Sequence, residues 1–117
     1  METLEKRVER LEYYHTLLLQ YIGPDKAPFY YYVMECRLSQ QEVEDFLQNC
    51  ERLNNEYKKQ KAEGFVIFTP LLEDFRQLIP NVLDLEKTID TLLAQHMFKP
   101  IMEEFKQLFY KDRRRKN

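Results

Sequence analysis

The chain has 117 residues, enough for one domain with a substantial core, and 44% of them are hydrophobic. Its formal net charge is −2, 32% of its residues are charged and only two are glycines, a composition that favours helices. Uninterrupted apolar runs reach about four residues, against the ~20 that cross a bilayer, and no apolar stretch typical of a signal peptide lies near the N-terminus. We therefore expect a cytoplasmic protein without membrane contact.

The charge is divided between an acidic body and a basic end. Residues 1–110 hold 13 basic and 19 acidic residues. An acidic body is not typical of a DNA-binding domain, which usually presents a basic face. We expect residues 1–110 to form a single helical domain and residues 111–117 a frayed basic tail. In that tail only Asp112 opposes five basic residues: Lys111, Arg113, Arg114, Arg115 and Lys116.

The first helix is predicted from about Glu2 to Ile22, where Gly23 and Pro24 end it. The apolar residues of this helix form a narrow seam along one face. A seam this narrow needs a second helix to cover it, so we expect a homodimer formed through the first helix. In a parallel pair Arg7 would face Glu12 of the other chain, but the sequence leaves parallel and antiparallel packing open. The predicted interface residues are spaced like the a and d positions of a short coiled coil: Leu4, Val8, Leu11, His15, Leu18 and Ile22.

The two halves of this helix differ in composition. Charged residues surround the seam as far as Glu12, whereas nearly every face is apolar from Tyr13 to Tyr21. The second half is therefore predicted to be embedded in a bundle, and the first half to lie along a single partner helix.

Two further helices are predicted before Gly64. One spans about Asp25 to Arg37, with Pro28 in its first turn. The other runs from Gln40 to about Glu63 and begins with a capping box in which Ser39 and Glu42 exchange hydrogen bonds. It would be about 36 Å long, close to the diameter of a compact globule of this size. We therefore expect the first and third helices to cross the molecule side by side.

Three shorter helices are predicted after Gly64. Residues 65–68 have no second strand to pair with, and we expect them to form an extended connector buried against the bundle. The fourth helix starts at a Thr69 cap, the fifth is capped by Asp84, and the sixth follows a break near residues 96–100. The expected fold class is all-α, a multihelical bundle of five or six helices.

His15 is the polar residue of the seam. A polar side chain at an a position typically sets register or oligomeric state at some cost in stability, and we favour this interpretation. The alternative is a pH switch, because two imidazoles facing each other across a dimer would resist both being charged at mildly acidic pH.

Aromatic residues are concentrated between positions 13 and 32. Six of the eight tyrosines lie there, and Lys26 is the only basic residue among them. Aromatic faces can stack on exposed bases, but a basic groove for a phosphate backbone is missing. We interpret the aromatic cluster as core and interface, with Tyr14, Phe29 and Tyr30 as candidate interface residues.

No catalytic or metal-binding signature is present. The two histidines and two cysteines lie far apart without ligand spacing, and two isolated glycines cannot build a phosphate-binding loop. We expect no enzymatic activity, no metal and no cofactor. Cys36 and Cys50 form no CxxC motif and are expected to be reduced, although a disulfide between them stays open.

The basic tail is the strongest functional candidate by charge. It is either a solvated helix end that complements the helix dipole, which we favour, or a contact for nucleic acid or an acidic partner. The residues concerned are Lys111, Arg113, Arg114, Arg115 and Lys116.

Four segments carry a family resemblance: Arg10-Leu11-Glu12-Tyr13-Tyr14, Pro28-Phe29-Tyr30, Gln60-Lys61-Ala62-Glu63-Gly64-Phe65-Val66 with Phe68, and Thr88-Ile89. They resemble the YhaI-like proteins, small uncharacterised proteins of Bacillus-type bacteria. The resemblance extends over roughly residues 2–109 and leaves out the basic tail. It implies an all-helical, dimeric, cytoplasmic protein and brings no functional residues with it.

The sequence thus favours a homodimeric protein-interaction or structural module, which binds itself and another protein. The alternative is a nucleic-acid-associated regulator that uses the basic tail.

Overall fold

Six helices account for most of the chain. The computed structural model describes residues 1–115, and the side chains of residues 1–112. Within this range the helices are α1 (Leu4–Lys26), α2 (Pro28–Glu35), α3 (Gln40–Ala62), α4 (Thr69–Leu78), α5 (Leu85–Ala94) and α6 (Lys99–Arg115), and no strand is present. No described helix has both the length and the apolar character needed to cross a membrane. The predicted all-α class is confirmed, with six helices in the described range where five or six were expected.

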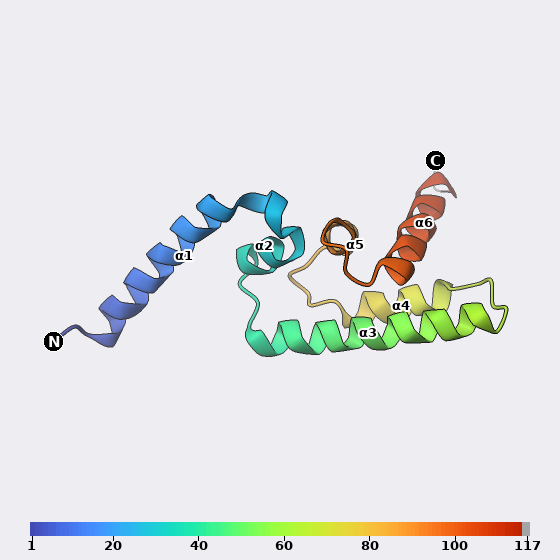
Figure 1. Ribbon diagram of the computed structural model, residues 1–117, viewed down its shortest axis with the longest axis horizontal. Helices are drawn as coiled ribbons and strands as arrows, with labels where there is room; N and C mark the ends of the chain where they lie inside the picture. The colour runs from blue at the N-terminus through green and yellow to red at the C-terminus, as the bar shows by residue number, and fades with distance from the viewer. Residues whose placement is uncertain (116–117) are drawn as a thin grey trace.

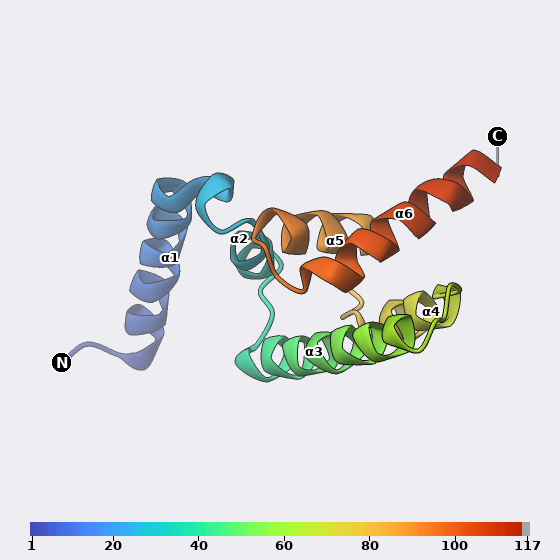
Figure 2. The same cartoon turned by 45° about the vertical axis from the view of Figure 1, so that its right-hand side comes forward.

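The helices form a body and an arm. Helices α2 to α6 gather into the body, while α1 extends away from it (Figure 1). The molecule is accordingly elongated, with extents of 64 × 30 × 23 Å. Helices α1 and α3 lie apart in both Figure 1 and Figure 2, so the expectation that they pack side by side is wrong. The physical reason is that α4 and α6 already pack against α3.

A run of aromatic rings crosses the body from α2 to α6. The ring of Phe29 in α2 lies 6.0 Å from Phe46 in α3, which lies 5.8 Å from Phe75 in α4. Phe75 in turn lies 5.0 Å from Phe105 in α6. Three residues of the predicted apolar stripe of α3 belong to the same core: Cys50, Leu53 and Tyr57. Most of the remaining core residues come from α4, α5 and α6.

Two predicted helix caps are confirmed. The hydroxyl of Ser39 accepts from the Glu42 amide at 3.1 Å, and the Glu42 carboxylate accepts from the Ser39 amide at 3.0 Å. The Asp84 carboxylate accepts from the Lys87 amide at 2.9 Å at the start of α5. The expectation for α4 is wrong by one residue, because Thr69 is already helical and Phe68 takes the capping position without a side-chain bond.

Two other helices are capped by side chains from distant parts of the chain. The Gln95 side-chain oxygen, just after α5, accepts from the amides of Phe29 and Tyr30 in the first turn of α2, at 2.9 and 3.2 Å. The Asn54 side-chain oxygen, on α3, accepts from the Ile101 amide in the first turn of α6 at 3.2 Å. These bonds fix α2 and α6 on the body by satisfying amides that a helix leaves unpaired at its start.

The connector between α3 and α4 differs from its expected position. Only Phe68 is buried, whereas Phe65, Val66 and Ile67 are 52%, 85% and 70% exposed. The expectation of a buried connector is therefore wrong for three of its four residues. The Phe68 ring meets Tyr57 edge-on at 4.7 Å, and this contact holds the entrance to α4 on the body while the preceding residues pass beyond the end of α3.

Candidate interaction surface

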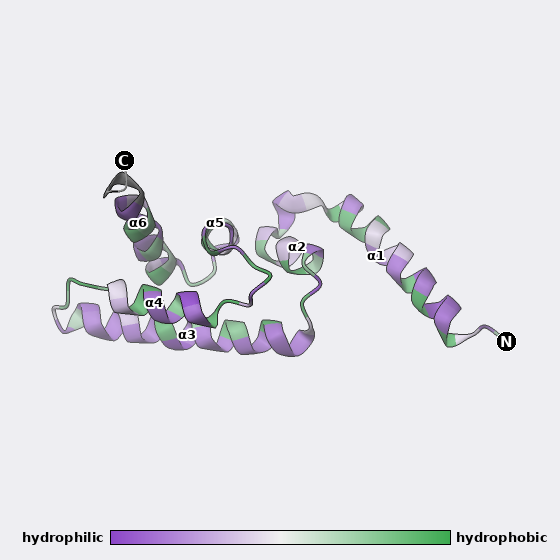
Figure 3. Ribbon diagram, turned by 180° about the vertical axis from the view of Figure 1, so that it is seen from behind, coloured by the Kyte–Doolittle hydropathy of each residue, from purple (hydrophilic) through white to green (hydrophobic). Residues whose placement is uncertain are grey.

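Helix α1 carries its apolar residues into solvent. None of its side chains is buried, and eight of its large hydrophobic residues are 43–81% exposed. Figure 3 shows hydrophobic and hydrophilic stretches alternating along this arm. The expectation that residues 13–21 are embedded in the bundle is therefore wrong within one chain, because α2 to α6 complete the core without them. The exposed residues are Leu4, Val8, Leu11, Tyr13, Tyr14, Leu17, Leu18 and Tyr21.

A kink at Gly23 sets the direction of this arm. Gly23 has a φ of 68°, in the left-handed region that glycine adopts readily, and it interrupts the helical conformation where the first helix was predicted to end. The chain resumes helical geometry through Lys26 and then enters α2 at Pro28. The kink lets α1 and α2 face each other at an angle while α1 stays clear of α3 to α6 (Figure 2).

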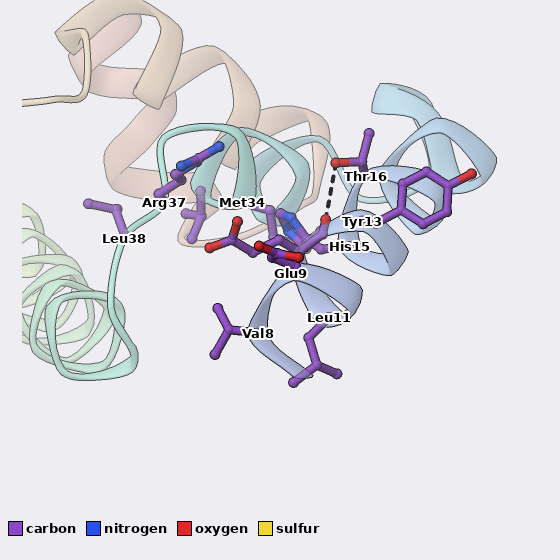
Figure 4. Close-up of a pocket in the computed structure, with 11 residues that line it drawn as sticks. Val8, Glu9, Leu11, Tyr13, His15, Thr16, Met34, Arg37 and Leu38 are labelled. Carbon is purple, nitrogen blue, oxygen red and sulfur yellow. Dashed lines mark hydrogen bonds between the residues drawn. The ribbon is translucent and has the colours of Figure 1, made fainter. Parts of the chain in front are cut away.

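A groove of about 670 Å³ separates α1 from α2. Its α1 wall includes Val8, Leu11 and His15. In Figure 4, Val8 and His15 lie nearer than Leu11 to the α2 side of the groove. Three apolar residues form much of the other wall: Val33, Met34 and Leu38. Charged residues also line it: Glu9, Glu12 and Arg37.

The end of α2 shapes the second wall. Arg37 has a φ of 58°, and its amide donates to the Met34 carbonyl at 3.2 Å. The Leu38 amide donates to the Val33 carbonyl at 3.3 Å, which completes a Schellman-type helix end. This turn brings Leu38 into line with Val33 and Met34 along the groove.

The structure brings half of the predicted interface residues to the groove. Val8, Leu11 and His15 line it, whereas Leu4 and Leu18 are exposed outside it and Ile22 is half-buried near the kink. The α2 wall was not predicted, because it faces α1 only through the turns at Gly23 and Arg37. A left-handed arginine leaves no signal in the sequence that could have pointed to it.

The three candidate interface aromatics divide into two groups. Tyr14 and Tyr30 are exposed and available to a partner. Phe29 is 0% exposed in the chain's own core, against Phe46, so its assignment to an interface is wrong. Phe29 and Tyr30 are neighbours on a helix and point to different sides, and periodicity alone could not say which side is inward.

The two cysteines form no disulfide with each other in the structure. Both are unpaired, Cys36 half-buried at the end of α2 and Cys50 buried in the core. No cluster of three or more His, Cys, Asp or Glu side chains suitable for a metal occurs within the described part of the chain. The histidines and cysteines, all within the described residues, are therefore not gathered into such a cluster.

The two thiols are expected to react very differently. Burial raises the pKa of the Cys50 thiol far above its usual range, so this group stays protonated through neutral and alkaline pH, and only a thiolate attacks a disulfide reagent. In the folded protein a disulfide reagent such as Ellman's reagent should therefore label Cys36 alone, and denaturation should release the second thiol. Rapid labelling of both thiols in the folded protein would contradict the burial of Cys50.

The C-terminal segment begins as part of α6. The helix continues through Arg115, so residues 111–115 extend α6, and the fraying expected for residues 111–117 stays a prediction. Lys111 is exposed on this helix. The side chains of Arg113, Arg114 and Arg115, and the whole of Lys116, lie outside the described part of the structure.

Residues 1–110 match a family that is described as a protein of unknown function, DUF1878. The chain belongs to the DUF1878 family. The match includes α1, both walls of the groove and the helical body, so the arm belongs to the part shared with this family. The basic residues that follow Tyr110 in this DUF1878 protein fall outside the match.

Proposed function

We propose that this DUF1878 protein is a homodimeric protein-interaction module, in which α1 of each copy lies in the α1–α2 groove of the other. The observation that carries the proposal is that α1 buries none of its own side chains while exposing eight large hydrophobic residues. An exposed apolar surface of this extent, next to a groove with apolar walls, typically marks a surface that another protein covers.

A second copy fits the charges of this surface. The groove contains Glu9 and Glu12, and α1 of a second copy would bring Arg7 close to Glu12 in a parallel pair. Neither Arg7 nor Glu12 has an ion-pair partner among the described residues. Arg10 is bound instead to Glu2 of its own helix. Each exposed pair adds only a few tenths of a kcal/mol, so the charges would favour an orientation while the apolar residues provide the affinity.

The proposal also covers the domain organisation, family, location and catalytic activity of the protein. We infer that residues 1–110 act as a single domain. We also infer that the protein is a YhaI-like member of its family, on the strength of the segments at residues 10–14, 28–30, 60–66 with Phe68, and 88–89. The proposed location is the cytoplasm, which two unpaired cysteines support. The module is proposed to have no catalytic activity and to need no cofactor.

Light scattering coupled to size-exclusion chromatography tests the dimer. The wild-type mass is expected to be twice the chain mass of 14.4 kDa, and Val8→Glu is expected to reduce it to the chain mass. The reason is that Val8 lies in the groove, where a partner would have to bury the new carboxylate among apolar side chains and beside two other carboxylates, Glu9 and Glu12, with Arg37 as the one arginine in the lining. Leu11→Glu should have the same effect.

Val82→Glu is the matched control, because Val82 is exposed in the loop between α4 and α5 and does not line the groove. It should leave the mass at that of the dimer. A wild-type monomer, or a dimer that survives both groove substitutions, would remove α1 from the interface. A species that carries nucleic acid, and loses it when residues 111–117 are deleted, would replace the module with the alternative regulator.

A further inference from the structure

The loop that joins α3 to α4 presents three consecutive apolar side chains to solvent. Phe65, Val66 and Ile67 are 52%, 85% and 70% exposed. The loop lies at one end of the longest axis of the molecule, and α1 extends toward the other end (Figure 1). In Figure 3 the loop stands out as a hydrophobic segment at the tip of a largely hydrophilic α3. We call residues 65–67 the apolar tip.

The apolar tip is held in place from both sides. Gly64 has a φ of 94° and its amide donates to the Lys61 carbonyl at 3.1 Å, while the Phe65 amide donates to the Gln60 carbonyl at 2.9 Å. On the other side, Phe68 is buried against Tyr57. Because both ends are fixed on the body, the exposure of the three side chains is a feature of the folded structure.

Four exposed lysines lie at the end of the molecule that carries the apolar tip. Lys58, Lys59 and Lys61 lie in the last turns of α3, and all three are exposed. Lys111, on α6, is also exposed and lines a cavity of about 280 Å³ together with Val66 and Ile67. Lys58, Lys59 and Lys111 form no ion pair with any described residue.

The charge balance at this end is opposite to that of the rest of the chain. Residues 58–67 and 108–112 contain four lysines and two acidic residues, Glu63 and Asp112, and the Glu104 side chain also reaches the cavity. Among the described residues, four lysines against Glu63, Glu104 and Asp112 leave this end slightly positive, in a chain whose first 110 residues are acidic overall.

We propose that the apolar tip and its lysines bind the surface of a membrane that contains anionic lipids. An apolar insertion and a set of basic residues are the two signals whose combination gives stable attachment to such a surface, and either one alone is weak. A tip at the end of an elongated molecule can be reached by a flat surface without hindrance from the body. This contact needs no membrane-spanning helix, and it replaces the expectation that the protein has no membrane contact.

Sedimentation with lipid vesicles tests the proposal on the full chain. The wild type is expected to sediment with vesicles of phosphatidylcholine and phosphatidylglycerol in equal parts, to bind pure phosphatidylcholine much more weakly, and to lose affinity as salt is raised. Val66→Glu combined with Ile67→Glu is expected to weaken the partition at least about ten-fold. Val82→Glu, an exposed valine away from the tip, should leave the partition unchanged.

A second pair of variants separates the charges from the fold. Lys59→Glu and Arg52→Glu are the same kind of charge reversal at exposed positions of α3, but only Lys59 lies near the tip. The first should weaken the partition by at least about five-fold and the second should not. Wild-type protein that stays in solution with anionic vesicles would overturn the proposal. So would a partition that survives both the tip and the Lys59 substitutions, and a protein that binds nucleic acid or a protein partner without binding vesicles.

The inference is independent of the proposed dimer. The tip and α1 lie at opposite ends of the molecule, so a Val8→Glu monomer should still bind anionic vesicles, although with lower avidity than a dimer with two tips. Loss of the dimer and loss of vesicle binding are therefore separate outcomes.

Discussion

Phe75→Ala is expected to lower the free energy of unfolding by about 3–5 kcal/mol, the range observed when a large buried aromatic residue is truncated. Phe75 is 0% exposed and stands between two other rings, Phe46 at 5.8 Å and Phe105 at 5.0 Å. These contacts join α4 to α3 and α6, so the cavity left by alanine would lie where three helices meet. A domain of this size is stable by only about 5–15 kcal/mol, which makes the loss a large fraction of the total.

Urea unfolding followed by circular dichroism measures this loss. Phe65→Ala is the matched control, because it removes the same atoms from a side chain on the exposed apolar tip. It should change the free energy of unfolding by less than about 0.5 kcal/mol. Equal losses for the two variants would show that the aromatic run is not the centre of the core.

The fold class and most helix boundaries could be predicted because their signals are local. The capping box at Ser39 joins groups three residues apart, and Asp84 accepts from an amide at the same separation. Such bonds form within one turn of chain, so residue identities and spacing are enough to predict them. The stripe of α3 is predictable for a similar reason, since one apolar face of a helix must be covered.

The packing of α1 could not be predicted from the same signals. The apolar residues between Tyr13 and Tyr21 show that this helix needs to be covered, but a sequence does not say whether the cover comes from its own chain or from another. Within a single chain, α1 buries no side chain, so its own chain does not cover it. The same limit applies to residues 65–67, whose apolar character predicted burial and which are exposed instead.

The candidate interaction surface was predictable in part for a related reason. The heptad spacing predicted Val8, Leu11 and His15, which line the groove. The opposite wall comes from residues 33–38, and it depends on two left-handed residues, Gly23 and Arg37. Glycine before proline is a recognisable signal for such a conformation, whereas arginine is not.

Asn54→Leu is expected to lower the free energy of unfolding by about 1–3 kcal/mol, although leucine is similar in size to asparagine and more hydrophobic. Asn54 is buried on α3, and its side-chain oxygen accepts from the Ile101 amide, 47 residues away at the start of α6. That amide belongs to the first turn of a helix, where no backbone carbonyl of the same helix can reach it. Leucine would leave it buried and unpaired, and an unpaired buried donor costs more than the added apolar surface contributes.

Asn55→Leu is the control for this prediction, since Asn55 is the next residue on α3 and is exposed. The same substitution there should change the free energy of unfolding by less than about 0.5 kcal/mol, measured in the same urea titration. A stability for Asn54→Leu equal to that of the wild type would mean that the Ile101 amide finds another acceptor. The expected difference between two adjacent asparagines also shows why this contact is invisible in the sequence. Both residues are asparagines with nearly the same neighbours in the sequence, and only the position of α6 in the folded chain makes one of them a helix cap.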